Sequence, residues 1–263
     1  MDITSPQNTK IKALKKLDKS AERREQGVFV IEGLRELCLA DGAVYQITQL
    51  FICEELLHQD ETYSLDKCKL EGTEVYNITK DVYESVAYRG TTEGVIATAQ
   101  PKSHALGSLS LSANPLILVI EGVEKPGNLG AMLRTCDAVA VDAVIVCDTK
   151  TDIYNPNAIR SSIGTVFTTQ IAVASTADVI AFLKEKNITT YAADLTATQS
   201  YYHKELAKPA AIVVGDEATG LSDEWVAAAN ERIKIPMLGR IDSLNVSVSA
   251  AVLLYEARRQ RSE

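Results

Sequence analysis

The sequence lacks the residue patterns that mark several common classes of protein. Its five cysteines form no CxxC pair, and its three histidines (His58, His104 and His203) lie far apart. These spacings argue against a disulfide framework and against a zinc or other metal site. No apolar run approaches the about 20 residues that a membrane helix needs, and the first residues contain no apolar segment of a secretory signal. We therefore expect a cytoplasmic protein with neither a metal nor a membrane partner.

Basic residues are outnumbered by acidic ones, 27 to 35, which gives a net charge of −8. Net charge argues against a nucleic-acid partner, but the distribution of charge is the better guide. Residues 1–30 contain seven lysines and arginines, and Arg258, Arg259 and Arg261 lie near the other end. These basic ends either contact a phosphate backbone or form solvated helix faces. Charge alone favours the solvated faces.

The first part of the chain has the pattern of a small α/β domain, over residues 1–100. Apolar residues at helical spacing predict one helix over residues 6–26. Further helices are expected at 34–42 and 79–87, and strands at 28–33, 47–53, 75–78 and 93–100. Residues 101–113 contain Ser, Gly and Pro without a clear apolar period, which predicts a linker.

The second part, residues 114–263, alternates apolar strands with helices. Continuous apolar strands are expected at 116–122, 143–148, 170–175, 189–194, 210–217 and 232–237. Such strands separated by helices predict a parallel sheet that is covered on both faces. Ligands of such sheets bind at the carboxyl ends of the strands. The chemistry is therefore expected in the loops that follow these strands.

Three of these loops contain polar residues. The first, "EGVEKPGNLG", leads to Asn128 and Arg134, and it contains neither the GxGxxG nor the GxxxxGK[ST] spacing of a phosphate-binding loop. The second, "VVGDEATGLS", contains Glu217 directly after a strand. The third opens the last helix with Ser243 and Asn245. Taken singly, each loop is explained by helix capping or by a solvated side chain.

Taken together and in this order, the three loops resemble a known family. "NLGAMLRTCDA", "VVGDEATGLS" and "IPMLGRIDSLNVSVSAAVLLYE" resemble the three motifs of the SpoU/TrmH family of RNA ribose 2′-O-methyltransferases, within the SPOUT superfamily. The segment "NPNAIRSSIGTVF" is similar to the family's connecting segment. On "GVFVIEGLREL", the first half resembles the small RNA-binding domain that many members carry. The resemblance implies a parallel α/β sheet with a deep trefoil knot.

The resemblance also implies a cofactor, a substrate and a set of site residues. The cofactor is S-adenosylmethionine, and the methyl acceptor is a ribose hydroxyl of RNA. The positions that match cofactor-contacting residues are Gly215, Ile235 and Leu244. The positions that match catalytic and RNA-facing residues are Asn128, Arg134, Glu217, Ser243 and Asn245. For Arg134 two roles stay open: a proton acceptor, or a clamp on the neighbouring phosphate.

Alternatives remain for the substrate, the activity and the assembly. The two-domain organisation favours ribosomal RNA over transfer RNA. A second hypothesis is a non-catalytic RNA-binding or ribosome-assembly protein on the same scaffold, although the retained motif residues argue against it. A dinucleotide-dependent oxidoreductase is disfavoured because GxGxxG is missing. The final helix, about residues 245–260, has an apolar face that is either buried within one subunit or, as the resemblance implies, packed in a homodimer.

Overall fold

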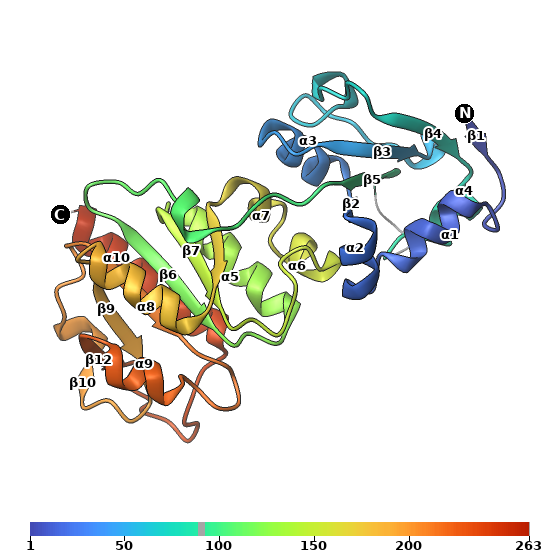
Figure 1. Cartoon of the computed structure of the whole chain (residues 1–263). Coiled ribbons are helices and arrows are strands. Elements are labelled where there is room, and N and C mark those ends of the chain that lie inside the picture. The colour runs from blue at the N-terminus through green and yellow to red at the C-terminus, as the bar shows by residue number, and fades with distance from the viewer. Residues whose placement is uncertain (89–92, 263) are drawn as a thin grey trace. The chain divides into compact units, whose positions relative to one another are not determined.

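The computed structural model describes residues 1–88 and 93–262. They form two compact units (Figure 1), each with its own sheet. Unit 1 consists of Met1–Ser103 and Asp152–Thr168, and unit 2 of His104–Thr151 and Thr169–Glu263. The chain therefore passes between the units at three points. The predicted mixed α/β class is confirmed; the trefoil knot stays a prediction.

Unit 1 contains a mixed five-stranded sheet in the order β1-β4-β3-β5-β2. Its strands are β1 (Asp2–Ile3), β2 (Phe29–Glu32), β3 (Ile47–Ile52), β4 (Glu74–Ile78) and β5 (Val95–Ala99). Strand β5 runs antiparallel to β2 and β3, whereas β4 runs parallel to β1 and β3. The helices are α1 (Thr9–Lys16), α2 (Ser20–Gln26), α3 (Leu34–Gly42), α4 (Lys80–Glu84), α6 (Pro156–Ser161) and α7 (Thr165–Thr168), with the short 3₁₀ turns η1 (Glu54–Leu56) and η2 (Leu65–Lys67).

The predicted single helix over residues 6–26 is in fact two helices, α1 and α2. Lys19 between them has an extended backbone, with φ −91° and ψ 131°. The side chain of Arg23 is buried and donates to the carbonyl oxygens of Leu17 and Asp18, at 2.6 and 2.9 Å. It also pairs with Asp152 at 2.8 Å. Arg23 thus satisfies the backbone at the break, and of the seven lysines and arginines in residues 1–30 it is one that is not free to contact a phosphate backbone.

Residues 152–168 pack with unit 1, although they lie within the range 114–263 that the sequence assigns to the second domain. The reason is an aromatic cluster. The ring of Tyr154 stacks on Phe29 with centroids 4.1 Å apart, and Phe167 lies 5.2 Å from Tyr45. The Tyr45 and Tyr154 hydroxyl groups lie 3.3 Å apart. This segment, between β7 and β8 in the chain, therefore completes the core of unit 1.

Unit 2 contains a parallel seven-stranded sheet in the order β10-β12-β9-β11-β6-β7-β8. Its strands are β6 (Leu116–Glu121), β7 (Ala143–Cys147), β8 (Ile171–Ala174), β9 (Thr189–Ala193), β10 (Gln199–Ser200), β11 (Ala210–Val214) and β12 (Glu231–Lys234). The helices are α5 (Pro126–Ala138), α8 (Thr176–Glu185), α9 (Asp223–Ala228) and α10 (Val246–Ser262), with the 3₁₀ turns η3 (Leu106–Ser108) and η4 (Tyr201–His203). The short strand β10 was not predicted.

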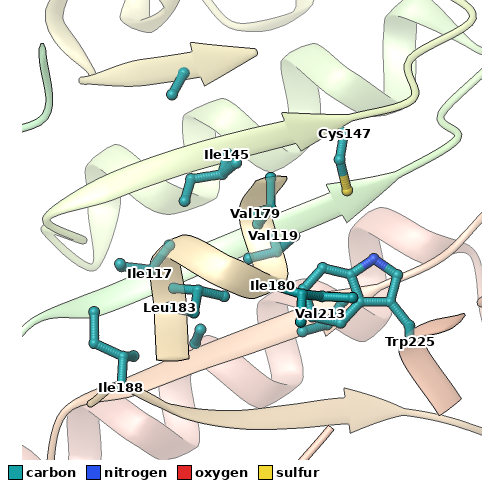
Figure 2. Close-up of a cluster of buried hydrophobic side chains, with 12 residues drawn as sticks. Ile117, Val119, Ile145, Cys147, Val179, Ile180, Leu183, Ile188, Val213 and Trp225 are labelled. Atoms are coloured by element: carbon teal, nitrogen blue, oxygen red, sulfur yellow. The ribbon is translucent and has the colours of Figure 1, made fainter. Parts of the chain in front are cut away.

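Helices cover both faces of this sheet. On one face α10 contacts α5, β6 and β11. On the other, α8 and α9 pack on a cluster that includes Ile117 and Val119 of β6, Ile145 of β7 and Trp225 of α9 (Figure 2). Every residue of β6 is buried, as expected for a strand between two helical layers.

Part of the predicted linker, residues 101–113, belongs to unit 2. Leu106, Leu109 and Leu111 pack against the cluster of Figure 2. The backbone N–H of Ser110 donates to Gln170 at 2.9 Å. These leucines have no helical or strand period, which explains why a Ser-rich segment was expected to be free.

Two of the three C-terminal arginines, Arg258 and Arg261, bind protein backbone. Arg258 donates to the carbonyl oxygens of Val139 and Ala140, both at 2.7 Å, where the last carbonyls of α5 lack helical partners. Arg261 donates to the carbonyl oxygens of Asn114 and Leu206, at 2.7 and 3.0 Å. Arg258 and Arg261 thus hold the end of α10 against unit 2, and neither of the two roles considered from the sequence describes them. Arg259 is exposed and pairs with Glu256 at 2.9 Å, which agrees with the solvated helix face.

Candidate active site

The three motif loops of unit 2 begin at one edge of the sheet. They follow β6, β11 and β12, and in a parallel sheet all carboxyl ends lie on the same edge. Strands β6 and β11 are neighbours, and β9 lies between β11 and β12. The predicted cofactor positions Gly215 and Ile235 are the residues directly after β11 and β12.

The first turn of α5 connects the three loops. Asn128 lies in this turn, and its Oδ1 accepts a hydrogen bond from Asn245 Nδ2 at 3.3 Å. Lys125, at the N-cap position of α5, pairs with Glu217 through Nζ and Oε2 at 2.7 Å. This hydrogen bond raises the pKa of Lys125. The structure thus brings Asn128, Glu217 and Asn245 around the start of one helix, and it adds Lys125, which sequence reasoning missed.

The loop over residues 215–222 is a tight turn. Asp216 and Gly220 form an antiparallel bridge, with N–H to carbonyl distances of 3.1 and 2.9 Å. Asp216 Oδ1 accepts from the backbone N–H groups of Ala218 and Thr219, and the bond from Ala218 is the main cause of a lowered pKa of Asp216. Glu217 lies within this turn, so the turn fixes the backbone of the carboxylate that pairs with Lys125.

The third loop, residues 235–245, ends at the cap of α10. Asn245 Oδ1 accepts hydrogen bonds from the backbone N–H and the hydroxyl of Ser247, at 3.0 and 2.6 Å. The capping function considered for Asn245 is therefore real, and its amide nitrogen still reaches Asn128. Ser243 is exposed and donates to Asp242 at 3.1 Å. Leu244 and Ile235 are half-buried.

Arg134 stands apart from these contacts. It is exposed on α5, and it forms no hydrogen bond or ion pair with any residue that the structure describes. A guanidinium without a protein partner is available for an external anion, and its planar donor fork matches phosphate.

Two features of the loops fit a bound ligand. The Asn128 Nδ2 atom is buried and has no hydrogen-bond partner among the described atoms, so it can donate a hydrogen bond to a ligand oxygen. At Gly215 a Cβ atom would lie 2.3 Å from the carbonyl carbon and oxygen of Gly220, so only glycine fits at this position without a shift of the backbone. S-adenosylmethionine carries carboxylate and hydroxyl oxygens that can accept from such a donor, so it suits this site.

Within residues 1–88 and 93–262 there is no group of His, Cys, Asp and Glu that could hold a metal ion. None of the helices described for these residues has the length and apolar character needed to cross a membrane.

The chain is similar to known proteins over both parts of its sequence. The sequence model of the SpoU rRNA Methylase family matches residues 115–255, and that of the MRM3-like substrate binding domain matches residues 8–97. The chain is 29% identical over 259 residues to the 23S rRNA (guanosine(2553)-2′-O)-methyltransferase RlmP of Bacillus subtilis, covering 97% of this chain and 98% of that protein.

Solved structures are similar over the whole chain. A crystal structure of an RNA 2′-O ribose methyltransferase is 39% identical with a TM-score of 0.87, covering 100% of both chains. An AdoMet-bound rRNA methyltransferase from Sinorhizobium meliloti is 27% identical with a TM-score of 0.89, covering 98% of this chain and 97% of that one. The family-model match over more than half of the chain, and the 39% identity over its full length, place the chain in the SpoU family of S-adenosylmethionine-dependent RNA ribose 2′-O-methyltransferases.

Proposed function

We propose that the protein methylates ribosomal RNA, in the cytoplasm, at a ribose that unit 1 helps to select. The observation that carries this proposal is the extent of the similarity to RlmP of Bacillus subtilis, which acts on 23S rRNA and is matched over nearly all of both chains. Unit 1 is included in that match, and residues 8–97 match a substrate-binding domain. Folded RNA is recognised by shape and exposed bases, which suits a dedicated domain.

We also propose roles for the candidate site residues. Bound S-adenosylmethionine would supply an electrophilic methyl group on a sulfonium. Gly215, Ile235 and Leu244 would hold it largely through their backbone, at the carboxyl edge of the sheet. Asn128 would donate its unpartnered Nδ2 to a ligand oxygen, and Asn245 holds the Asn128 side chain at 3.3 Å.

Arg134 would clamp the phosphate next to the target ribose and orient the 2′-hydroxyl for attack, because its guanidinium is exposed and has no protein partner. Glu217 is held by Lys125 beside the same turn, and Ser243 is exposed in the third loop, where each would face the RNA. Alignment of acceptor and donor supplies a large part of the rate in such transfers.

The substrate is tested with labelled S-adenosylmethionine and unmodified RNA. The purified protein should transfer methyl groups to 23S rRNA transcripts or ribosomal particles and much less to transfer RNA. Mapping 2′-O-methyl groups in cells with and without the gene should show one or a few sites lost in ribosomal RNA. Loss of a site in transfer RNA alone would overturn the ribosomal assignment, and transfer to no RNA would overturn the proposed substrate altogether.

We propose further that the protein forms a homodimer through α10. Val248 and Tyr255 are 47% and 55% exposed, and with Val252 they form an apolar stripe at helical spacing. The opposite side of α10, including Leu253 and Leu254, is fully buried within the subunit. One subunit therefore buries only part of the apolar surface of α10, and a twofold contact between two copies of the stripe would bury the rest.

Sedimentation should therefore show a species of about 57 kDa, twice the 28.6 kDa of one chain. Tyr255→Glu should shift it to monomer without unfolding, because Tyr255 is exposed in the subunit. Tyr202→Glu, at a tyrosine 51% exposed on η4, is the matched control and should leave the dimer intact. A wild-type monomer at micromolar concentration would contradict the dimer.

The cofactor loop is tested by Gly215→Ala. Because the new Cβ would overlap the Gly220 carbonyl, the two sides of the turn must separate, at a cost of about 1–3 kcal/mol. We expect S-adenosylmethionine affinity to fall by roughly ten- to a hundredfold in calorimetry. Gly107→Ala, where a Cβ meets nothing within 4 Å, should leave affinity unchanged. Equal affinities in the two variants would remove the 215–222 loop from the cofactor site.

A further inference from the structure

A buried carboxylate, that of Glu121, lies next to the candidate cofactor loop and outside the candidate site residues. Glu121 is the last residue of β6 and is 7% exposed. Its Oε1 accepts hydrogen bonds from the hydroxyl groups of Ser222 and Thr176, at 2.7 and 3.1 Å. Its Oε2 accepts from the backbone N–H of Ser222 at 2.8 Å. A buried carboxylate needs such partners, and here two of the three bonds go to one residue.

Glu121 meets both ends of the 215–222 loop. In the sheet, Val214 of β11 pairs with Ile120 of β6, so Glu121 lies beside Gly215 in the parallel register. The Glu121 side chain reaches Ser222, where the loop ends and α9 begins. The loop therefore starts at Gly215, beside the Glu121 backbone, and ends at Ser222, which is hydrogen-bonded to the Glu121 carboxylate.

The rest of the loop depends on the position of these ends. The Gly220 backbone lies against Gly215, and the Asp216–Gly220 bridge leaves little freedom between them. A shift of Ser222 would move Gly220 and Leu221, and through them the turn that contains Glu217. Among the residues that the structure describes, only Glu121 has a carboxylate on β6 that accepts hydrogen bonds both from α8, at Thr176, and from the start of α9, at Ser222.

We propose that Glu121 is a positioning residue, whose carboxylate holds the 215–222 loop in the shape that binds S-adenosylmethionine. This inference rests on the proposed placement of the cofactor in that loop. Glu121 contacts neither cofactor nor RNA, and it acts through the two hydrogen bonds to Ser222. The third bond, from Thr176, anchors the carboxylate to α8 and lies outside the loop.

The separate bonds allow a test with matched variants. Glu121→Ala should weaken S-adenosylmethionine binding at least about tenfold, with a matching rise in KM for the cofactor and a smaller change in kcat. Glu121→Gln should recover most of the affinity, because the amide oxygen still accepts from the Ser222 N–H. Ser222→Ala should weaken binding by an intermediate factor. Thr176→Val, which removes one bond to the same carboxylate but none to the loop, should leave the affinity within about twofold.

The outcomes separate the inference from the function. If Thr176→Val weakens cofactor binding as much as Ser222→Ala, the carboxylate serves general stability and the inference is wrong. It is equally wrong if Glu121→Ala melts at a lower temperature yet binds the cofactor normally. If Glu121→Ala does not fold, the comparison of Ser222→Ala with Thr176→Val decides alone. Failure of the wild-type protein to bind S-adenosylmethionine would instead overturn the cofactor assignment itself.

Discussion

Arg134→Ala should reduce methyl transfer by about 10²–10³-fold, the usual cost of removing one donor that acts on the reacting groups. Its affinity for S-adenosylmethionine should be unchanged. Both expectations follow from the position of Arg134, which is exposed on α5 and contacts no other described residue. Its removal leaves no buried group unpaired, so the fold should be unaffected. Single-turnover transfer and calorimetry measure the two quantities separately.

Arg134→Lys is the matched variant. It keeps the charge but loses the planar fork, so a phosphate clamp predicts partial activity and an unchanged salt dependence of RNA binding. Arg134→Ala should reduce the slope of log affinity against log salt by about one. If Arg134 is instead the proton acceptor, Arg134→Ala and Arg134→Lys should both be inactive, and both should keep the RNA affinity of the wild-type protein. Loss of cofactor binding in a folded Arg134→Ala protein would contradict either role.

Removal of residues 1–103 should give an aggregating protein, although the sequence alone predicts an independent second domain. The reason is the segment 152–168, which would lose the rest of unit 1. Residues that are now at most 6% exposed would face solvent: Ile153, Tyr154, Ala158, Ile159, Val166 and Phe167. Contiguous apolar surface of this kind causes association. Size-exclusion chromatography of the truncated protein should show large species.

A second truncation provides the control. When residues 152–168 are also replaced by a Gly/Ser linker of equal length, unit 2 should become soluble and should bind S-adenosylmethionine, because every candidate site residue lies outside the removed segments. RNA affinity should fall in this variant. If the simple deletion of residues 1–103 is monodisperse and binds the cofactor, the packing of 152–168 contributes little to solubility.

Much of the architecture could be predicted from local patterns. The parallel sheet follows from the apolar strands of unit 2, and the end of α3 at Gly42 and the cap of α9 at Ser222 follow from residue type. The break between α1 and α2 could not be predicted, since Ile11, Leu14 and Leu17 have helical spacing up to the break. Arg23 satisfies the backbone at this break, and its ion-pair partner, Asp152, is more than a hundred residues away in the chain.

The site shows the same limit. The motif positions of Asn128 and Asn245 were recognised by resemblance, whereas their contact with each other required the fold. Lys125 gave no signal because an exposed lysine before a proline is ordinary. The sequence signal for Glu121 was weak: it is an acidic residue at the end of an otherwise apolar strand. Likewise, the period of residues 152–168 cannot indicate which sheet they cover, because an apolar helix face fits either.

The division of unit 1 into two stretches of chain has a consequence for biosynthesis. Domains commonly fold during translation, N-terminal first, at roughly 5–20 residues per second. Here the first stretch ends at Ser103 and the second at Thr168, about 65 residues later. During an interval of roughly 3 to 13 seconds the nascent chain holds Phe29 and Tyr45 without the rings of Tyr154 and Phe167 that cover them. Strands β6 and β7 are synthesised within that interval, so the core of unit 1 is completed only after these two strands of unit 2 have been synthesised.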